Sequence, residues 1–254
     1  MNNIKIISVE AKKGYYLVTT SENDYKFEED TIVKYEVFND KEFTKAEFNK
    51  ILSFNDNQVA FNKALRYLGY GPRSKMEMLK YLKEKGFNNY KDVIKRLSEY
   101  GYIDDKKLAK DMVSYYIDLK KGPLYILKKM NEKAISDEVA SVAINEYSKD
   151  LEEELCLELS KDLATKLSEY PVKKQKTTLY SRLISKGYPP DVIRHTIEKT
   201  EFVDESDSNL VKDYEKLKAK VSKKELSEYE ARNYIVEHLL AKGYEYKKIK
   251  DILE

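Results

Sequence analysis

Cationic side chains recur in four short turns where one helix is expected to end and the next to begin. These junctions read Gly71-Pro72-Arg73-Ser74-Lys75 (first), Lys120-Lys121-Gly122-Pro123 (second), Pro171-Val172-Lys173-Lys174 (third) and Ser222-Lys223-Lys224 (fourth). Lysine and arginine recognise phosphates and carboxylates, so the chemistry indicated is anion binding. Equivalent turns of a repeat array line up along one side, which predicts a basic stripe. The alternative is that the lysines only complement the negative ends of the preceding helices, which fits Lys120 and Lys121.

Charge is unevenly distributed along the chain, although the whole carries only +2. Residues 61–135 hold 18 basic and 9 acidic residues, a net +9, whereas residues 136–170 hold 3 and 10, a net −7. A block of this kind suits a polyanion or an acidic protein groove, although a solvated helical surface explains it equally well. The acidic block is expected to face basic protein surface.

Aromatic rings are interleaved with the cations of the basic block. The tyrosines are Tyr67, Tyr70, Tyr81, Tyr115, Tyr116 and Tyr125. Together with lysine they suit nucleic acid, through base stacking and phosphate contact, but packing is the leading interpretation of each one. The candidate protein- and nucleic-acid-binding residues are therefore Arg73, Lys75, Lys80, Lys83, Lys120, Lys121, Lys128, Lys129, Lys173 and Lys174.

Catalytic groups do not come together in this sequence. The two histidines, His195 and His238, have no Cys or His at metal-ligand spacing, and the single cysteine, Cys156, is expected in a helix core. Asp104 and Asp105 are adjacent but open a helix, where capping explains them. No phosphate-binding glycine loop occurs. We predict a protein that is not an enzyme and uses no metal or cofactor, so that replacing either histidine or Cys156 leaves function intact.

The composition indicates a helix-rich chain. Its 254 residues include 36% charged residues, 8 Gly, 5 Pro and no Trp, and Lys, Glu and Leu favour helices. No run approaches the roughly 18 apolar residues that cross a bilayer, and the start lacks the apolar stretch of a signal peptide. With one cysteine, a cytoplasmic location and no membrane partner are expected.

The first 35 residues differ from the rest. Partly alternating β-branched and aromatic residues at 4–9, 15–20 and 25–27 predict a small antiparallel meander, closed by a short helix within 28–37. Thr44 is the expected N-cap of a helix over residues 46–52, with Glu47 completing a capping box. We expect strands in these first 35 residues only, within a β-rich extension over residues 1–56.

A Lys-(Gly/Ala)-apolar signature returns four times beyond this extension. Its central residues are Gly86, Ala134, Gly187 and Gly243. Each predicts a helix end in which the central residue is left-handed and the next packs back; since Ala134 is not glycine, we expect a different cap there. A longer helix precedes and a short amphipathic one follows each signature. The fold class is therefore mainly α, with about twelve helices in tandem three-helix repeats over residues 57–103, 104–147, 148–203 and 204–254.

The order and spacing of several motifs resemble the RecX family of RecA recombinase regulators. These motifs are Ala64-Leu65-Arg66-Tyr67-Leu68, Arg73-Ser74, Leu79-Lys80-Tyr81-Leu82, Lys85-Gly86-Phe87, Gly101-Tyr102-Ile103-Asp104-Asp105 and Lys121-Gly122-Pro123. The resemblance is close over residues 60–147 and weaker through the later repeats. The β-rich start and Glu29-Asp30-Thr31-Ile32-Val33-Lys34 resemble the N-terminal extension of Gram-positive members.

The resemblance implies an elongated, curved array of three-helix repeats that binds within the groove of the RecA–DNA filament. It further implies a monomeric, non-enzymatic regulator of recombination, DNA repair and the SOS response. The regulator would modulate, in the leading hypothesis inhibit, strand exchange and ATP hydrolysis, and would contact single- and double-stranded DNA more weakly. Matched positions are Arg73, Ser74, Lys121, Gly122 and Pro123, with a structural role favoured for the serine, glycine and proline. A fourth repeat goes beyond the commonest three. The alternatives are an autonomous helical DNA-binding protein, such as a transcription factor, and a protein-only scaffold.

Overall fold

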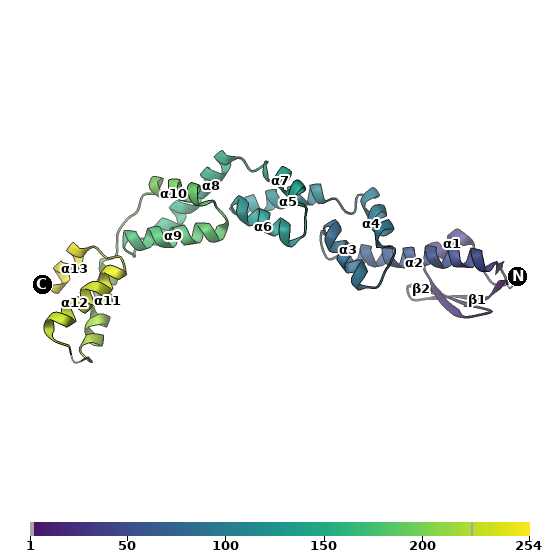
Figure 1. Ribbon diagram of the computed structural model, residues 1–254, viewed down its shortest axis with the longest axis horizontal. Coiled ribbons are helices and arrows are strands. Elements are labelled where there is room, and N and C mark those ends of the chain that lie inside the picture. The colour runs from purple at the N-terminus through teal and green to yellow at the C-terminus, as the bar shows by residue number, and fades with distance from the viewer. Residues whose placement is uncertain (1–2, 225) are drawn as a thin grey trace. The chain divides into compact units, whose positions relative to one another are not determined.

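The computed structural model describes residues 3–224 and 226–254 of the chain. It divides into two compact parts, one made of Met1–Ala109 with Asn131–Val139 and the other of Lys110–Met130 with Ala140–Glu254. The described residues form thirteen helices and four strands, so the chain is mainly α-helical with a small N-terminal sheet, as the sequence predicted (Figure 1).

A four-stranded antiparallel sheet opens the first part, in the order β3-β2-β1-β4. The strands are β1 (Ile4–Lys12), β2 (Tyr15–Thr20), β3 (Asp24–Phe27) and β4 (Glu42–Phe43). The first three are the predicted meander, in which Val18 of β2 lies opposite Val9 on one side and Tyr25 on the other. Strand β4 shows that confining strands to the first 35 residues was wrong. Its two residues pair with Ile4 and Lys5 and are too few to leave a periodic pattern.

Two helices, α1 (Glu29–Tyr35) and α2 (Lys45–Leu68), share a hydrophobic core with this sheet. Phe27 from β3 and Phe48 and Ile51 from α2 are almost completely buried there. The predicted capping box is confirmed, because the Thr44 hydroxyl accepts the Glu47 amide at 3.2 Å and the Glu47 carboxylate accepts the Thr44 amide at 2.9 Å.

Helix α2 is one continuous helix, so its expected end at Leu52 is wrong. The boundary predicted between residues 56 and 57 falls inside it. The polar residues beyond Leu52 interrupt the apolar pattern. Asn55, however, is buried. Its side-chain oxygen accepts a hydrogen bond from the Glu28 amide at 2.9 Å, and its side-chain nitrogen donates to the Lys26 carbonyl at 3.0 Å. Tertiary hydrogen bonds thus hold this polar stretch against the sheet in helical form, which local periodicity does not reveal.

The remaining helices follow the predicted order of long, middle and short. They are α3 (Lys75–Glu84), α4 (Tyr90–Glu99), α5 (Asp105–Asp118), α6 (Pro123–Glu132), α7 (Asp137–Ile144), α8 (Lys149–Thr165), α9 (Val172–Lys186), α10 (Pro190–Lys199), α11 (Asp207–Val221), α12 (Glu228–Ala241) and α13 (Tyr246–Leu253). With α2 they make twelve helices, and no strand lies among the described residues beyond 60. The division into four repeats, numbered 1 to 4 in chain order, stays a prediction.

Hydrophobic cores of repeats 1, 3 and 4 are each centred on a fully buried leucine of the middle helix. These leucines are Leu82 in α3, Leu183 in α9 and Leu239 in α12. Cys156 belongs to the core of repeat 3 and is completely buried, as its place in a leucine-rich helix indicated. Helices α8, α9 and α10 pack together around that core (Figure 1).

All four signatures end a middle helix in a left-handed residue. The φ angle is +81° at Gly86, +52° at Ala134, +89° at Gly187 and +98° at Gly243. Ala134 is left-handed like the three glycines; its amide donates to the Asn131 carbonyl at 2.7 Å, and the following Ile135 is buried. A left-handed alanine costs about 1 kcal/mol, which the packing of Ile135 offsets.

Candidate interface for protein and nucleic acid

The first junction has one acidic neighbour, Glu77. The Arg73 guanidinium lies 4.4 Å from the centroid of the Tyr67 ring and 3.7 Å from the Glu77 carboxylate. Lys133, from the signature of repeat 2, reaches the same carboxylate at 3.4 Å. Ser74 caps α3, and its hydroxyl also donates to the Lys133 carbonyl. Arg73 therefore already has an aromatic and an acidic partner within its own part of the molecule.

Other candidate cations of repeat 1 lie on the surface of α3. Lys75 and Lys80 are exposed, and the Lys83 ammonium lies 4.9 Å from a tyrosine ring of α4. Tyr67 and Tyr81 stack at 4.1 Å with their planes 9° apart. The interpretation of these two tyrosines as packing residues fits this stacking.

The second junction separates its two lysines. Lys120 pairs with Glu158 of α8 at 2.7 Å, and the hydrogen bond to that carboxylate raises the pKa of Lys120. The Lys121 ammonium instead lies 4.4 Å from the centroid of the Tyr125 ring, and Lys129, one turn along α6, lies 5.6 Å from the same ring. Lys121 thus faces cations and an aromatic ring.

Lys186 completes a group of cations that the sequence analysis missed. Burial, followed by the positive charges of Lys186 and Lys129, lowers the pKa of Lys121. We call Lys121, Tyr125, Lys129 and Lys186 the junction-2 cluster. By its place in the sequence, Lys186 can complement the charge at the end of α9, and nothing local indicates that this helix end meets the second junction.

Signatures meet the junctions of the preceding repeats. At the first junction the contact is the hydroxyl bond to the Lys133 carbonyl described above. At the second, the amides of Gly122 and Leu124 donate to the carbonyls of Lys186 and Gly187 at 2.9 and 3.1 Å. The carboxyl end of one middle helix therefore meets the amino end of another, where their end charges attract.

The third junction carries Lys173 and Lys174, both exposed. Gly243 of the repeat 4 signature faces this turn, since a Cβ built on Gly243 would lie 3.4 Å from the Cβ of Lys173. Lys128, on the exposed side of α6, completes the predicted set. The alignment of the junctions into one stripe stays a prediction.

A further basic and aromatic group lies in repeat 4. The ammonium groups of Lys220 and Lys224 lie 5.9 and 4.2 Å from the centroid of the Tyr234 ring. The hydrogen bond with Lys220 lowers the pKa of Tyr234. The ring also stacks on His238 at 3.8 Å, which gives this histidine a packing partner.

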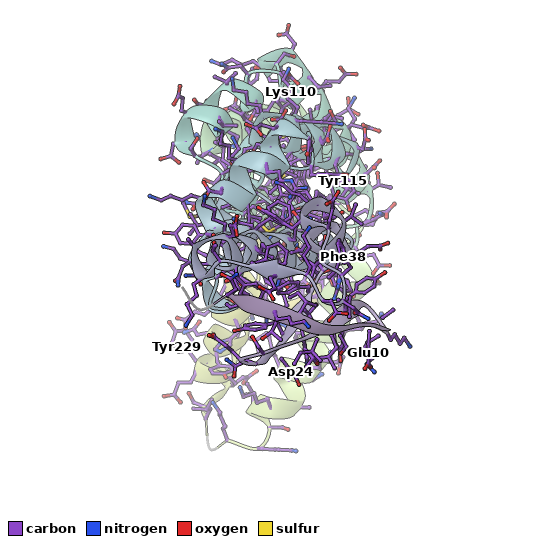
Figure 2. All side chains as sticks on the ribbon, turned by 90° about the vertical axis from the view of Figure 1, so that its right-hand side faces the viewer. Glu10, Asp24, Phe38, Lys110, Tyr115 and Tyr229 are labelled. Atoms are coloured by element: carbon purple, nitrogen blue, oxygen red, sulfur yellow. The ribbon has the colours of Figure 1, made fainter. Side chains whose placement is uncertain are left out.

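Two tyrosines contradict their interpretation as packing residues. Tyr70 is 84% exposed and Tyr115 is 58% exposed. The Tyr115 side chain is labelled in Figure 2. Tyr115 lies edge-on to Tyr116 at 5.1 Å, and Tyr116 lies edge-on to Tyr125 at 5.3 Å. A row of rings therefore leads from an exposed side chain to the junction-2 cluster.

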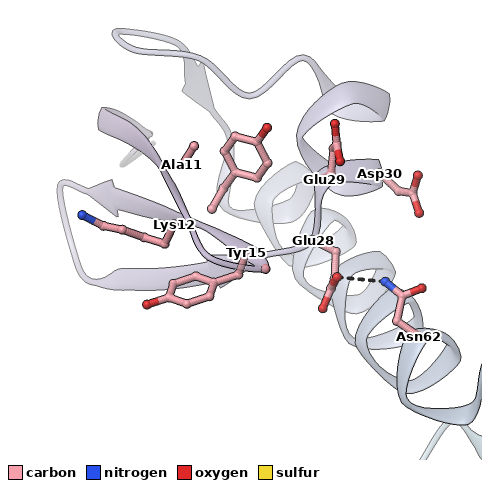
Figure 3. Close-up of a pocket in the computed structure, with 9 residues that line it drawn as sticks. Ala11, Lys12, Tyr15, Glu28, Glu29, Asp30 and Asn62 are labelled. Carbon is pink, nitrogen blue, oxygen red and sulfur yellow. Dashed lines mark hydrogen bonds between the residues drawn. The ribbon is translucent and has the colours of Figure 1, made fainter. Parts of the chain in front are cut away.

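The first part of the molecule holds an acidic pocket of about 320 Å³ (Figure 3). Glu28, Glu29 and Asp30 line it together with Tyr15, and the Asn62 side chain donates to the Glu28 carboxylate at 2.8 Å. Its charge suits a cationic group, which is the opposite chemistry to the basic junctions.

Within residues 3–224 and 226–254, no three His, Cys, Asp or Glu side chains are grouped so that they could hold a metal ion. His195 is exposed on α10. No helix in the described part of the chain is both long and apolar enough to cross a membrane.

Comparison with known proteins gives consistent matches. A family model for the first three-helix domain of RecX matches residues 60–97. The regulatory protein RecX of Lactococcus lactis subsp. cremoris (strain SK11) is 28% identical over 263 residues, covering 98% of this chain and 97% of the relative. That of Streptococcus agalactiae serotype V is 27% identical over 259 residues, covering 98% of each.

Two solved structures share the fold. A crystal structure of regulatory protein RecX matches with a TM-score of 0.60 and 22% identity, over 77% of this chain and 99% of that one. RecX from Lactobacillus salivarius matches with a TM-score of 0.53 and 26% identity, over 57% and 96%. The fold and the near full-length matches make this chain similar to the regulatory proteins named RecX.

Proposed function

We propose that this protein regulates homologous recombination and DNA repair by binding the RecA recombinase–DNA filament and inhibiting its strand exchange and ATP hydrolysis. It acts in the cytoplasm as a monomer, with no cofactor and no reaction of its own. The observation that carries the proposal is the junction-2 cluster, in which Lys121 and Lys129 lie over the Tyr125 ring and Lys186 lies near Lys121, in a chain whose relatives are named regulatory proteins.

A filament of recombinase and DNA offers partners for both the basic and the acidic groups of this protein. DNA phosphates and acidic protein side chains suit the exposed cations at the junctions, since each neutralised phosphate releases counterions. The acidic pocket lined by Glu28, Glu29 and Asp30 suits cationic protein side chains. Mixed contacts of this kind favour a protein–DNA partner over bare DNA.

Repetition adds affinity without strong individual contacts. Four predicted repeats, each presenting a basic junction, reach several filament subunits at once, and linked weak contacts combine into tight binding. The candidate set at these junctions is Arg73, Lys75, Lys80, Lys83, Lys120, Lys121, Lys128, Lys129, Lys173 and Lys174. Arg73 and Lys120 contribute least, because each already faces a carboxylate.

The proposal is tested by measuring recombinase ATP hydrolysis and strand exchange on single-stranded DNA while this protein is added below stoichiometric amounts. Both rates are expected to fall. Rates and filament lengths that stay constant would refute the proposal.

Autonomous DNA binding is the second candidate, and the junction-2 cluster also favours it, because its lysines and rings need only a nucleic acid. The two are separated by comparing affinity for free DNA with affinity for recombinase-coated DNA. The proposed function predicts tighter binding to the coated DNA, whereas an autonomous DNA-binding protein binds free DNA at least as well.

A further inference from the structure

The contacts between signatures and junctions leave one member of each kind uncovered. The signatures of repeats 2, 3 and 4 meet the junctions of the repeats before them, through Lys133, Gly187 and Gly243 respectively. Among the residues that the structure describes, no junction receives the signature of repeat 1 (Lys85-Gly86-Phe87), and no signature covers the fourth junction. These two surfaces are the open ends of one repeated contact.

The signature of repeat 1 has the conformation of a docked signature without a partner. Lys85 and Gly86 are exposed, and a Cβ built on Gly86 would meet no atom within 4 Å beyond its chain neighbours. A Cβ built on Gly187 would instead overlap the Tyr125 amide nitrogen, because the second junction covers that signature. The φ angles of the two glycines are nonetheless alike, +81° and +89°.

The fourth junction leads into the same helix cap as the first. Ser74 and Ser227 are the N-caps of α3 and α12, and each forms a capping box, with Glu77 and Glu230 respectively. Ser74 is completely buried, and its hydroxyl donates to the Lys133 carbonyl of the incoming signature. Ser227 is exposed, and its hydroxyl donates to the Glu230 carboxylate at 2.7 Å. The cap of α12 thus presents, uncovered, the groups that receive a signature at the first junction.

Charge favours a signature in that place. At the first junction the Lys133 ammonium lies 3.4 Å from the Glu77 carboxylate. Lys85 holds the place of Lys133 in the signature of repeat 1, and Glu230 holds the place of Glu77 in the cap of α12. The partial negative charge at the end of α3 would also face the partial positive charge at the start of α12. Tyr229, next to the cap, is 75% exposed and offers apolar surface to the contact.

We propose that the signature of repeat 1 in one copy of this protein docks on the cap of α12 in another copy. Lys85 then lies beside Glu230, and the Ser227 hydroxyl donates to the Lys85 carbonyl. The contact joins two different surfaces, so each pair of copies still presents one free surface of each kind.

This inference goes beyond the proposed function, in which the free chain is a monomer. One contact between helix ends is small and therefore weak, so it forms between copies that are concentrated or held side by side. A second copy is the favoured partner because the contact continues a pattern already present within the chain. In each internal contact the signature of a later repeat meets the junction of an earlier one, and docking of repeat 1 after repeat 4 keeps that order.

Sedimentation velocity of the full chain over a wide range of concentrations tests the inference. The weight-average sedimentation coefficient is expected to rise with concentration as copies join. A coefficient that stays at the monomer value up to the solubility limit would overturn the inference.

Two charge reversals identify the surfaces that join. Lys85→Glu brings two carboxylates together and Glu230→Lys brings two ammonium groups together, so each should lower the association constant roughly tenfold, a usual coupling between contacting charges. Mixing the two variants in equal amounts should restore association, because each then meets the opposite charge on its partner. Lys91→Glu, exposed on α4, makes the same charge change as Lys85→Glu and should associate like the native chain.

Restoration on mixing separates docking from folding, since Glu230→Lys also removes the capping box of α12. Glu230→Gln keeps a side chain that can complete the box and should weaken association less than Glu230→Lys. Failure of the mixture to associate would overturn the inference, as would equal losses from Lys85→Glu and Lys91→Glu. These measurements use neither recombinase nor DNA, so failure of this inference and failure of the proposed function are separately observed.

Discussion

The first and second junctions make the same contact between helix ends with different chemistry. At the first, the Ser74 hydroxyl donates to the incoming helix end, and the Glu77 carboxylate lies near both Arg73 and Lys133. At the second, backbone amides receive it, and Tyr125 occupies the third position of α6, where α3 has Glu77. The same helix position thus holds a carboxylate between two cations at the first junction and an aromatic ring between two lysines at the second.

The largest effect is expected from reversing the charges of the junction-2 cluster. Changing Lys121, Lys129 and Lys186 to Glu should weaken binding to single-stranded DNA strongly. It should also reduce the slope of log affinity against log salt by about 2, since each phosphate contact on a single strand contributes about 0.7. Affinity measured at several salt concentrations checks this.

The matched control changes three cations of the N-terminal segment, Lys5, Lys12 and Lys13, to Glu. Two of these already have acidic partners, Asp40 for Lys5 and Glu10 for Lys12. Equal losses from both triple variants would mean that only net charge matters, and the distinction between the two junctions would fail.

Converting the second junction into the first is expected to have the next largest effect. Tyr125→Glu places a carboxylate among Lys121, Lys129 and Lys186, as Glu77 lies between its two cations. DNA affinity should fall severalfold while the unfolding midpoint stays the same or rises. Tyr125→Phe, which keeps the ring, should bind DNA almost normally. If Tyr125→Glu bound DNA as well as the native chain, the positive charge of the junction-2 cluster would not be the reason for binding.

Removing the carboxylate of Glu77 tests the structural role of the first junction. Glu77→Ala removes a capping box and leaves Arg73 and Lys133 without their shared carboxylate. The free energy of unfolding should fall by about 1 kcal/mol, the usual cost of losing a helix cap. Urea unfolding measures it, with Glu84→Ala at the exposed end of the same helix as control. An unchanged free energy of unfolding would show that the Glu77 carboxylate contributes nothing to stability.

The smallest effect is expected at the signature that meets the first junction. Ala134 has a φ angle of +52°, which glycine adopts without the steric cost of a Cβ. Ala134→Gly should therefore raise the free energy of unfolding by about 0.5 kcal/mol, because the relief of strain exceeds the added freedom of the unfolded chain. Thermal unfolding checks the sign, and a clear loss of stability would mean that the alanine side chain packs productively.

Local features of the fold were predictable from sequence. The meander, the Thr44 capping box and the four signatures depend on residues close together in the chain, so their patterns carry the information. The continuity of α2 was not predictable, because Asn55 is held by hydrogen bonds to the distant Lys26 and Glu28.

Prediction of the candidate site was incomplete for the same reason. Lys121 and Lys129 were identified from their junction and helix, but Lys186 joins them only through a contact across more than sixty residues of chain. Arg73 and Lys120 are also cations at comparable positions, yet each already lies near a carboxylate, Arg73 near Glu77 and Lys120 near Glu158. Composition and spacing identify cations; the fold decides which are neutralised.

The role of the junction-2 cluster in regulation is decided by recombinase ATP hydrolysis on single-stranded DNA, titrated in parallel with the native chain and with the Lys121, Lys129 and Lys186 triple-Glu variant. We expect the native chain to lower the rate below stoichiometric amounts. The variant, equally well folded by circular dichroism, should have a much weaker effect at the same concentration. Identical inhibition by the two proteins, or none by the native chain, would contradict it.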